Sequence, residues 1–186
     1  MLLRHLPNLL TILRLAAAPA TAGLLAAGHF SAALALFVFA GLSDAADGFL
    51  AKRFGLSTPL GRFLDPLADK ALMLAVFITL ARLDEVPVWL TATVIARDLL
   101  IVSGLAVALA LRAPISIKPV MAGKICTATQ VVYIGLHLAS LAFGFSIAWI
   151  SPADAYITAG VAFASAIAYS SVWLNAMQSI GRKDFA

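Results

Sequence analysis

The sequence predicts an all-α integral membrane protein, a bundle of six transmembrane helices that forms a single domain over residues 1–186. Of these residues 62% are hydrophobic and only 12% are charged, whereas a soluble domain averages roughly 45–50% apolar and about 25% charged residues. The apolar residues also fall into long segments, each close to the roughly 20 residues with which a helix crosses a bilayer. The length of the chain accommodates six such helices with short loops.

The boundaries between the helices are predicted from proline, glycine and capping residues. Gly28–His29 is short enough to be a tight connection, and Pro87 precedes an apolar run as first-turn prolines do. Ser151, Pro152 and Asp154 have the types expected for an N-cap, a first-turn proline and a first-turn acid. The predicted helices cover about residues 9–27, 31–51, 64–83, 88–111, 119–143 and 151–178.

The distribution of lysine and arginine predicts the orientation in the membrane. In a six-helix arrangement every Lys and Arg except Arg82 and Arg97 lies near the side that carries both termini. Because cationic loops stay in the cytoplasm, we expect both termini on the cytoplasmic side of the cell inner membrane. The cations are scattered singly between apolar segments, which argues against nucleic acid as a partner. The single cysteine excludes a disulfide framework.

Four aspartates lie where the second predicted helix ends and the third begins. Asp44 and Asp47 are three residues apart, and Asp65 and Asp69 are four apart, so each pair shares one face of a helix. If the two helix ends lie side by side, the four carboxylates converge on one small volume. Such a cluster needs a strong counter-charge, and oxygen ligands favour Mg²⁺ or Mn²⁺. The sequence therefore predicts an active site with one or two divalent ions at the cytoplasmic interface.

The residues around these aspartates resemble the signature of a known family. They read D-x-x-D-G-x-x-A-K, then eight residues, then G-x-x-x-D-x-x-x-D. This is similar to the motif D-x2-D-G-x2-A-R-x8-G-x3-D-x3-D of the CDP-alcohol phosphatidyltransferases, with Lys52 where the family usually has Arg. The segments Pro7–Arg14 and Lys124–Gln130 also resemble the bacterial phosphatidylglycerophosphate synthases and the cardiolipin synthases of this family.

The resemblance implies roles for the residues of the motif. Asp44, Asp47, Asp65 and Asp69 would form the binding set for two divalent ions, and Asp69 would also be the base that deprotonates the acceptor hydroxyl. Lys52 keeps the positive charge of the usual Arg but loses its bidentate geometry, so Lys52 or its neighbour takes the phosphate contact. The residues expected to bind the CDP-lipid are Gly48, Ala51, Lys52, Arg53 and Gly61.

Two features inside the predicted helices have structural interpretations. Arg97 and Asp98 lie near the middle of the fourth helix, where charges are rare. Adjacent residues do not face each other on a helix, so we expect each to find its partner on another helix. Arg97 is then either part of a polar clamp between helices or a lining residue of a substrate cavity. Gly104 and Gly135 are expected to be close contacts between helices.

The binding site for the acceptor is predicted from polar residues near the same side. Asn8, Thr11 and Arg14 are three residues apart, which suits a polar lining of a cavity as well as a helix cap. Lys124 is a suitable ligand for a phosphate on the acceptor. The expected acceptor-binding residues are Asn8, Thr11, Arg14, Arg97 and Lys124.

The resemblance implies transfer of a phosphatidyl group from CDP-diacylglycerol to an alcohol, with release of CMP. The first predicted acceptor is glycerol 3-phosphate, which yields phosphatidylglycerophosphate. Phosphatidylglycerol, which yields cardiolipin, is the alternative, and an inositol phosphate is a third acceptor. Membrane lipid is a further expected partner, and homodimerisation is common among such enzymes. A divalent-cation transporter is the alternative from another class, but transport sites usually lie near the bilayer midplane rather than at one interface.

Overall fold

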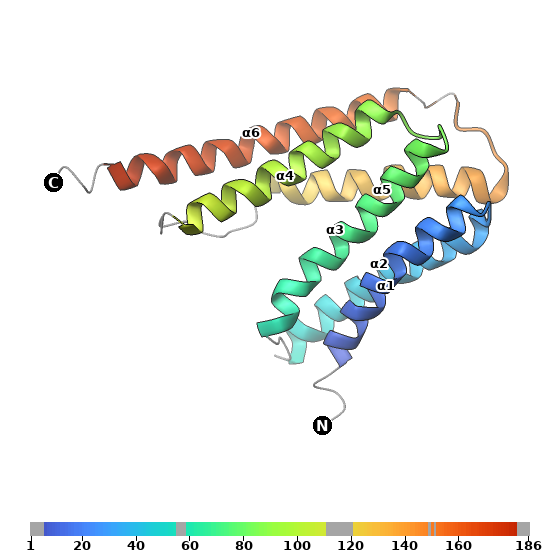
Figure 1. Ribbon diagram of the computed structural model, residues 1–186, viewed down its shortest axis with the longest axis horizontal. Coiled ribbons are helices and arrows are strands. Elements are labelled where there is room, and N and C mark those ends of the chain that lie inside the picture. Colours follow the sequence, from blue (N-terminus) through green and yellow to red (C-terminus); the bar gives the residue numbers. More distant parts are fainter. Residues whose placement is uncertain (1–5, 55–58, 111–120, 149, 151, 182–186) are drawn as a thin grey trace. The chain divides into compact units, whose positions relative to one another are not determined.

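The computed structural model describes residues 6–54, 59–110, 121–148, 150 and 152–181, and within these ranges it leaves out the side chains of residues 6–11, 44–54, 59–67, 105, 108–110 and 175–181. All regular structure in the described ranges is α-helical, which confirms the all-α prediction. The helices, labelled in Figure 1, are α1 (Leu6–Ala26), α2 (Phe30–Phe54), α3 (Pro59–Arg82), α4 (Val88–Ala110), α5 (Met121–Phe143) and α6 (Ala153–Gly181).

The helix boundaries agree with the sequence prediction to within about three residues, except at the start of α3. This helix begins at Pro59 rather than near Leu64. Proline is well suited to the first helical position, because its fixed φ matches the helix and its missing N–H has no intrahelical partner there. Gly61 therefore lies in a helix and not in a loop.

The helices are grouped in two compact units. The first unit comprises residues 1–86 and 134–147, and the second comprises residues 87–133 and 148–186. The first thus holds α1, α2, α3 and the end of α5, and the second holds α4, the start of α5 and α6. The division leaves the prediction of a single domain untested.

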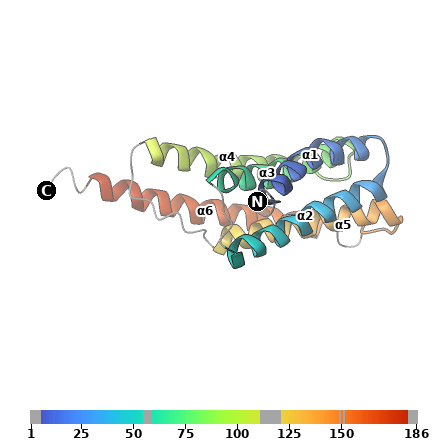
Figure 2. The ribbon, with the colours of Figure 1, turned by 90° about the horizontal axis from the view of Figure 1, so that it is seen from below.

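In the first unit α1 packs against both α2 and α3. The core side of α3 follows the helical period, with buried side chains at positions 72, 73, 76, 77 and 80. Leu25 of α1 and Ala33 of α2 are also fully buried. The start of α1, the end of α2 and the start of α3 lie at the same end of this unit, as the two views of the ribbon show (Figures 1 and 2).

Two helices of the first unit end with the same hydrogen-bonded turn. After α1, Gly28 has φ +77°, its N–H donates to the Leu25 carbonyl, and the His29 N–H donates to the Leu24 carbonyl. This is a Schellman motif, and it forms the short connection to α2 that the sequence predicted. The same pair of bonds closes α3, with Asp84 at φ 58° in the position that usually belongs to glycine. Aspartate tolerates this left-handed conformation better than most other residues.

In the second unit α4 packs along α6. At their starts the Trp89 and Tyr156 rings are stacked, with centroids 5.2 Å apart. Further along, the Trp173 indole lies against Gly104, where a Cβ would come within 2.0–2.2 Å of three indole carbons. Gly104 is therefore a close packing contact, as predicted.

The corresponding prediction for Gly135 is wrong. Among the described residues no neighbouring atom lies within 4 Å of the place that its Cβ would occupy. An unpredicted close contact involves Gly123 instead, since a Cβ there would meet the Tyr169 hydroxyl at 2.7 Å.

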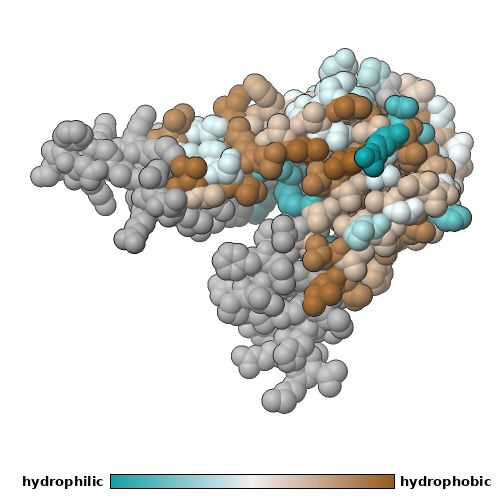
Figure 3. Space-filling view, viewed as in Figure 1, coloured by the Kyte–Doolittle hydropathy of each residue, from teal (hydrophilic) through white to brown (hydrophobic). Residues whose placement is uncertain are grey.

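Apolar side chains cover much of the surface that the structure describes. Figure 3 shows them across the visible face, and residues such as Val88, Phe143 and Phe163 are 66–74% exposed. Soluble monomers rarely expose apolar patches of this extent. Two helical segments in the described range are long and apolar enough to cross a membrane, Met121–Phe143 and Ala153–Leu174. Shorter apolar segments occupy Ile12–Ala26 and Phe30–Ser43.

Candidate active site

The acidic motif is carried by two helices of the first unit. Asp44 and Asp47 lie in the last turns of α2, and Asp65 and Asp69 lie in the first turns of α3. Both segments are helical, so each pair shares a helix face as predicted. Four residues separate the two helices, and a chain of that length spans at most about 18 Å between the helix ends.

The structure describes the side chain of only one of these aspartates. The Asp69 residue is half-buried, and the preceding residue of α3, Ala68, is fully buried. The side chains of Asp44, Asp47 and Asp65 lie outside the described residues, as do those of the predicted nucleotide-binding residues Gly48, Ala51, Lys52, Arg53 and Gly61. Their backbone places the first four of these in α2 and Gly61 in α3.

The donor chemistry of the motif fits a divalent cation. The side chains that the structure describes contain no group of three or more His, Cys, Asp or Glu residues, and three of the four aspartates are outside that set. Four carboxylates supply oxygen ligands only, and oxygen ligands suit Mg²⁺ or Mn²⁺. The residue types of the motif therefore fit the ions that the sequence predicts.

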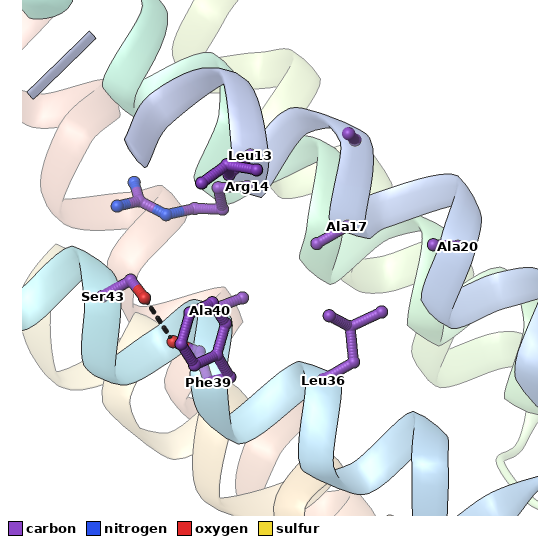
Figure 4. Close-up of a pocket in the computed structure, with 9 residues that line it drawn as sticks. Leu13, Arg14, Ala17, Ala20, Leu36, Phe39, Ala40 and Ser43 are labelled. Carbon is purple, nitrogen blue, oxygen red and sulfur yellow. Dashed lines mark hydrogen bonds between the residues drawn. The ribbon is translucent and has the colours of Figure 1, made fainter. Parts of the chain in front are cut away.

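Arg14 is a buried cation close to this end of the unit. Its residue is only 2% exposed, and the nitrogen atoms of its guanidinium are fully buried. Figure 4 shows the guanidinium beside Ser43 of α2, which directly precedes Asp44. Burying a guanidinium without anions nearby is very costly, so the acidic end of α2 is a suitable environment for it. The structure thus brings one predicted acceptor-binding residue next to the acidic motif.

Two other predicted acceptor residues lie on the same helix as Arg14. Asn8 and Thr11 precede Arg14 at intervals of three residues in α1, so the three follow one slowly drifting face. The side chains of Asn8 and Thr11 lie outside the described residues.

Arg97 forms a buried polar cluster in the second unit. Its residue is 6% exposed, Nη1 donates to Asp98 Oδ1 at 2.7 Å, and Nη2 donates to Ser165 Oγ at 2.6 Å. The guanidinium also lies 5.8 Å from the centre of the Tyr169 ring, a distance compatible with a cation–π interaction. Ser165 and Tyr169 are one turn apart on α6, so the cluster joins α4 to α6.

This geometry confirms the predicted partner of Arg97 on another helix and corrects the expectation that Arg97 and Asp98 do not face each other. Arg97 and Asp98 were each expected to find a partner on another helix, because adjacent Cβ atoms diverge. Arg97 does reach Ser165 of α6, but it also pairs with Asp98. The arginine side chain is long and flexible enough to bend back around its own helix, so the divergence of the Cβ atoms does not decide the contact.

Lys124 lies at the start of α5 in the second unit and is exposed. Its neighbour Gly123 is the residue that packs against Tyr169. Lys124 is thus held next to a fixed contact between α5 and α6 while its own side chain remains accessible to a ligand.

Comparison with known proteins identifies the family. The family model for CDP-alcohol phosphatidyltransferase matches residues 4–174. The chain belongs to the CDP-alcohol phosphatidyltransferase family. The matched region includes the acidic motif on α2 and α3 together with Arg14 and Arg97, so the resemblance in the sequence is confirmed for nearly the whole chain.

Three relatives illustrate the range of this family. A fusion protein of Schizosaccharomyces pombe, named cardiolipin synthase (CMP-forming) / mitochondrial hydrolase, is 33% identical over 95% of this chain and 32% of its own length. The cardiolipin synthase (CMP-forming) of Rattus norvegicus is 32% identical over 76% of this chain and 52% of its own. The CDP-diacylglycerol–glycerol-3-phosphate 3-phosphatidyltransferase of Bacillus subtilis is 35% identical over 72% of this chain and 76% of its own. The chain thus spans about a third to a half of the two cardiolipin synthases and about three quarters of the B. subtilis protein.

The sequence analysis did not predict several residues that lie beside Arg14 in the first unit or Arg97 in the second. Ser43 of α2 lies beside Arg14 but precedes the motif by one position, and no spacing rule includes it. Ser165 and Tyr169 were missed as partners of Arg97, although a serine and a tyrosine one turn apart in an apolar helix were a usable signal. Ser165 is fully buried, which is unusual for serine unless it is hydrogen-bonded.

Proposed function

We propose that the chain transfers the phosphatidyl group of CDP-diacylglycerol to glycerol 3-phosphate, which yields phosphatidylglycerophosphate and CMP. The observation that carries this proposal is the complete acidic motif on two consecutive helices of a chain that belongs to the family. The B. subtilis relative is named for the transfer to glycerol 3-phosphate, and the chain spans about three quarters of its length.

In this proposal the aspartates of α2 and α3 surround the reacting phosphates. Asp44, Asp47 and Asp65 hold two divalent ions, Mg²⁺ or Mn²⁺, together with Asp69. When bound, these ions neutralise the pyrophosphate and stabilise charge on the attacking and leaving oxygens. Asp69 takes the proton of the acceptor hydroxyl, whose oxygen forms a bond to the phosphorus that carries diacylglycerol. The bond from that phosphorus to the oxygen of CMP breaks, and CMP leaves.

In this scheme the cations of α2 and the small residues of α2 and α3 recognise the nucleotide. Lys52 and Arg53 meet the phosphates of the CDP-lipid, while Gly48, Ala51 and Gly61 leave room for the nucleotide to approach the helix backbones. Arg14 and Lys124 are the acceptor-side cations, and Asn8 and Thr11 belong to the same polar lining. A phosphate on glycerol 3-phosphate needs cations of this kind.

The geometry of Arg97 favours the structural interpretation over acceptor binding. Its two terminal nitrogens already donate to Asp98 and Ser165. A polar clamp between α4 and α6 therefore occupies both terminal nitrogens without a ligand. We therefore assign Arg97 to the packing of the second unit.

The setting of the enzyme follows from the same reasoning. We place it in the cell inner membrane as a bundle of six transmembrane helices, with both termini and the acidic site on the cytoplasmic side. There a lipid substrate and a soluble nucleotide product both have access. A homodimer is the expected assembly. A divalent-cation transporter is disfavoured by the family membership and by the placement of the acids near the end of α2 and the start of α3, which this proposal puts at one membrane interface.

A second acceptor, phosphatidylglycerol, is favoured by a specific observation. The S. pombe and rat relatives are both named cardiolipin synthase, and the first aligns with 95% of this chain. With this acceptor the same transfer yields cardiolipin. The acidic motif serves either reaction, so the difference between them has to come from the acceptor side of the site.

The deciding experiment measures CMP release by the purified chain with CDP-diacylglycerol, Mg²⁺ or Mn²⁺ and one acceptor at a time. Release with glycerol 3-phosphate alone is expected. Release with phosphatidylglycerol alone would make the protein a cardiolipin synthase, and release with inositol phosphate would assign the third acceptor. No metal-dependent release with any of these acceptors would refute the proposed activity.

A further inference from the structure

The phenol ring of Tyr169 on α6 lies against the first turn of α5, and both belong to the second unit. The Oη, Cε2 and Cζ atoms of the ring are 2.7, 3.0 and 3.3 Å from the position that a Cβ of Gly123 would occupy. Gly123 is buried, whereas Lys124, the next residue, is exposed. Because glycine has no side chain, the ring reaches the backbone of α5 here. The contact therefore fixes the turn that carries Lys124.

Tyr169 is held in place by the packing of its own helix on α4. Ala162 and Ser165, two turns and one turn earlier on α6, are fully buried, and α4 packs along α6. The Arg97 guanidinium also lies 5.8 Å from the centre of the ring, within the range of a cation–π interaction. In Arg97→Met the thioether would still pack on the ring, so the place of the ring does not depend on the charge of Arg97.

The start of α5 relies on contacts of this kind. Among the described residues of the second unit, α4 and α6 are the helices that pack closely along each other, and α5 is not part of this pair. A single aromatic contact therefore has a large share in fixing the first turn of α5. A displacement of that turn is passed on to the Lys124 ammonium, and misplacing a substrate-binding group by about 1 Å can cost about 100-fold in rate.

We propose that Tyr169 is a positioning residue for the acceptor. Through Gly123 it fixes the start of α5, and thereby the place of the Lys124 ammonium that binds the phosphate of glycerol 3-phosphate. In this proposal Tyr169 itself touches neither substrate. The inference rests on the proposed function in one respect, since it takes from there the role of Lys124 as a phosphate ligand.

The first test compares two aromatic residues of α6. Tyr169→Ala removes the ring, whereas Tyr169→Phe keeps the ring and removes only the hydroxyl. Tyr156→Ala is the matched control, because Tyr156 also contacts α4, through its stacking on Trp89. It lies about 20 Å from Tyr169 along α6, at 1.5 Å per residue. For each variant KM and kcat are measured with glycerol 3-phosphate and with CDP-diacylglycerol as the varied substrate.

The expected result is a change confined to the acceptor. Tyr169→Ala raises the KM for glycerol 3-phosphate roughly tenfold, about the effect of losing one hydrogen bond to a charged group, and leaves the KM for CDP-diacylglycerol unchanged. Tyr169→Phe and Tyr156→Ala change neither. A merely structural role would lower the fraction of active protein, and so the apparent kcat, without changing either KM. An unchanged KM for glycerol 3-phosphate in Tyr169→Ala would overturn the proposal and leave the proposed activity intact.

A second variant disturbs the contact from α5 and keeps the ring. Gly123→Ala places a methyl group 2.7 Å from the Tyr169 hydroxyl, so the turn has to shift, and the KM for glycerol 3-phosphate rises as in Tyr169→Ala. Gly135→Ala is the control on the same helix, because no neighbouring atom among the described residues lies within 4 Å of its Cβ position. Equal KM values for Gly123→Ala and Gly135→Ala would overturn the proposal.

The last test does not depend on turnover and separates the two proposals. The purified protein is treated in detergent with Mg²⁺ and an amine-reactive ester, and the acylation of Lys124 is followed by mass spectrometry as glycerol 3-phosphate is added. Glycerol 3-phosphate is expected to protect Lys124, with a half-protecting concentration that rises roughly tenfold in Tyr169→Ala but not in Tyr169→Phe or Tyr156→Ala. Protection that follows this pattern without CMP release would refute the proposed activity and support the positioning role. No protection of Lys124 in the unchanged protein, or equal protection in all variants, would refute the positioning role of Tyr169 even if the enzyme released CMP.

Discussion

The contact between Gly104 and Trp173 provides a quantitative test of how α4 and α6 pack. In Gly104→Ala the new methyl group would lie 2.0–2.2 Å from three carbons of the Trp173 indole, well inside van der Waals contact. The indole is rigid, so either the whole ring or one of the helices has to move. Overpacking of this kind typically costs about 1–3 kcal/mol.

A matched substitution removes the effect of helix propensity from the comparison. Alanine is more favourable than glycine inside a helix by up to about 1 kcal/mol, which partly offsets the clash at Gly104. Gly160→Ala is the control, because Gly160 lies in α6 and has no neighbouring atom within 4 Å of its Cβ position among the described residues. At about 2–4 °C per kcal/mol for a chain of this size, Gly104→Ala should melt about 2–12 °C below Gly160→Ala.

The chain contains its own reporter for this measurement. Cys126 is the only cysteine of the sequence, and its residue is fully buried in the second unit. Thermal unfolding in detergent can therefore be followed by the reaction of Cys126 with a thiol-specific dye that becomes fluorescent on coupling. Equal melting temperatures for Gly104→Ala and Gly160→Ala would refute the packing of the indole on Gly104. Restoration by a second change, Trp173→Leu, would support it through the double-mutant cycle.

Four further substitutions test the site and the fold. Arg97→Met removes the ion pair with Asp98 and the hydrogen bond to Ser165, and should lower stability by about 3 kcal/mol, or about 6–12 °C in the Cys126 assay, with an unchanged KM for glycerol 3-phosphate. A raised KM with normal melting would instead assign Arg97 to the acceptor. Asp69→Asn should abolish CMP release while the melting temperature stays within about 2 °C of wild type, and near-normal turnover would exclude Asp69 as the base. Lys52→Arg should keep or raise kcat/KM for the CDP-lipid, since Arg adds a bidentate phosphate contact; a severe loss would mean that Lys52 does not act as a phosphate ligand. Asp84→Gly should stabilise the chain by up to about 1 kcal/mol, because glycine adopts φ 58° without strain, and destabilisation in the same assay would show that the Asp84 side chain contributes a contact of its own.

The helices were predictable because their signals are local. Long apolar runs, the Gly28 turn and Pro87 depend on residues close in the sequence, and α1, α2 and α4 begin and end within about three residues of the prediction. The start of α3 was missed for a local reason as well. The segment from Pro59 to Phe63 was left outside the third predicted helix, although proline is favourable at a first helical position.

Contacts between helices were less predictable, as the glycines show. Gly104 and Gly135 lie in similar apolar surroundings in the sequence, yet only Gly104 has a bulky neighbour. A glycine indicates that a close approach is possible, and the partner helix decides whether one occurs. The pairing of Arg97 with Asp98 shows the same limit for side chains. The rule for adjacent helical residues describes the directions of their Cβ atoms, and a long side chain such as arginine can still reach its neighbour.

The prediction of the acidic site depended both on local spacing within helices and on contacts between helices. The helical spacing of Asp44 with Asp47, and of Asp65 with Asp69, is a property of each helix, and the helical structure of both segments confirms it. Whether the two pairs converge depends on the distance between α2 and α3, which sequence spacing does not determine.

Arg14 adds a physical argument that is independent of the motif. A guanidinium that is 2% exposed, beside the residue that precedes Asp44, is stable only where anions offset its lost hydration. Replacing Arg14 by Met should therefore destabilise the first unit if the carboxylates gather there. Among the described side chains of α1, Arg14 is the only buried cation, so its loss would leave the repulsion between the carboxylates without a counter-charge from that helix. The addition of Mg²⁺ should then restore part of the lost stability.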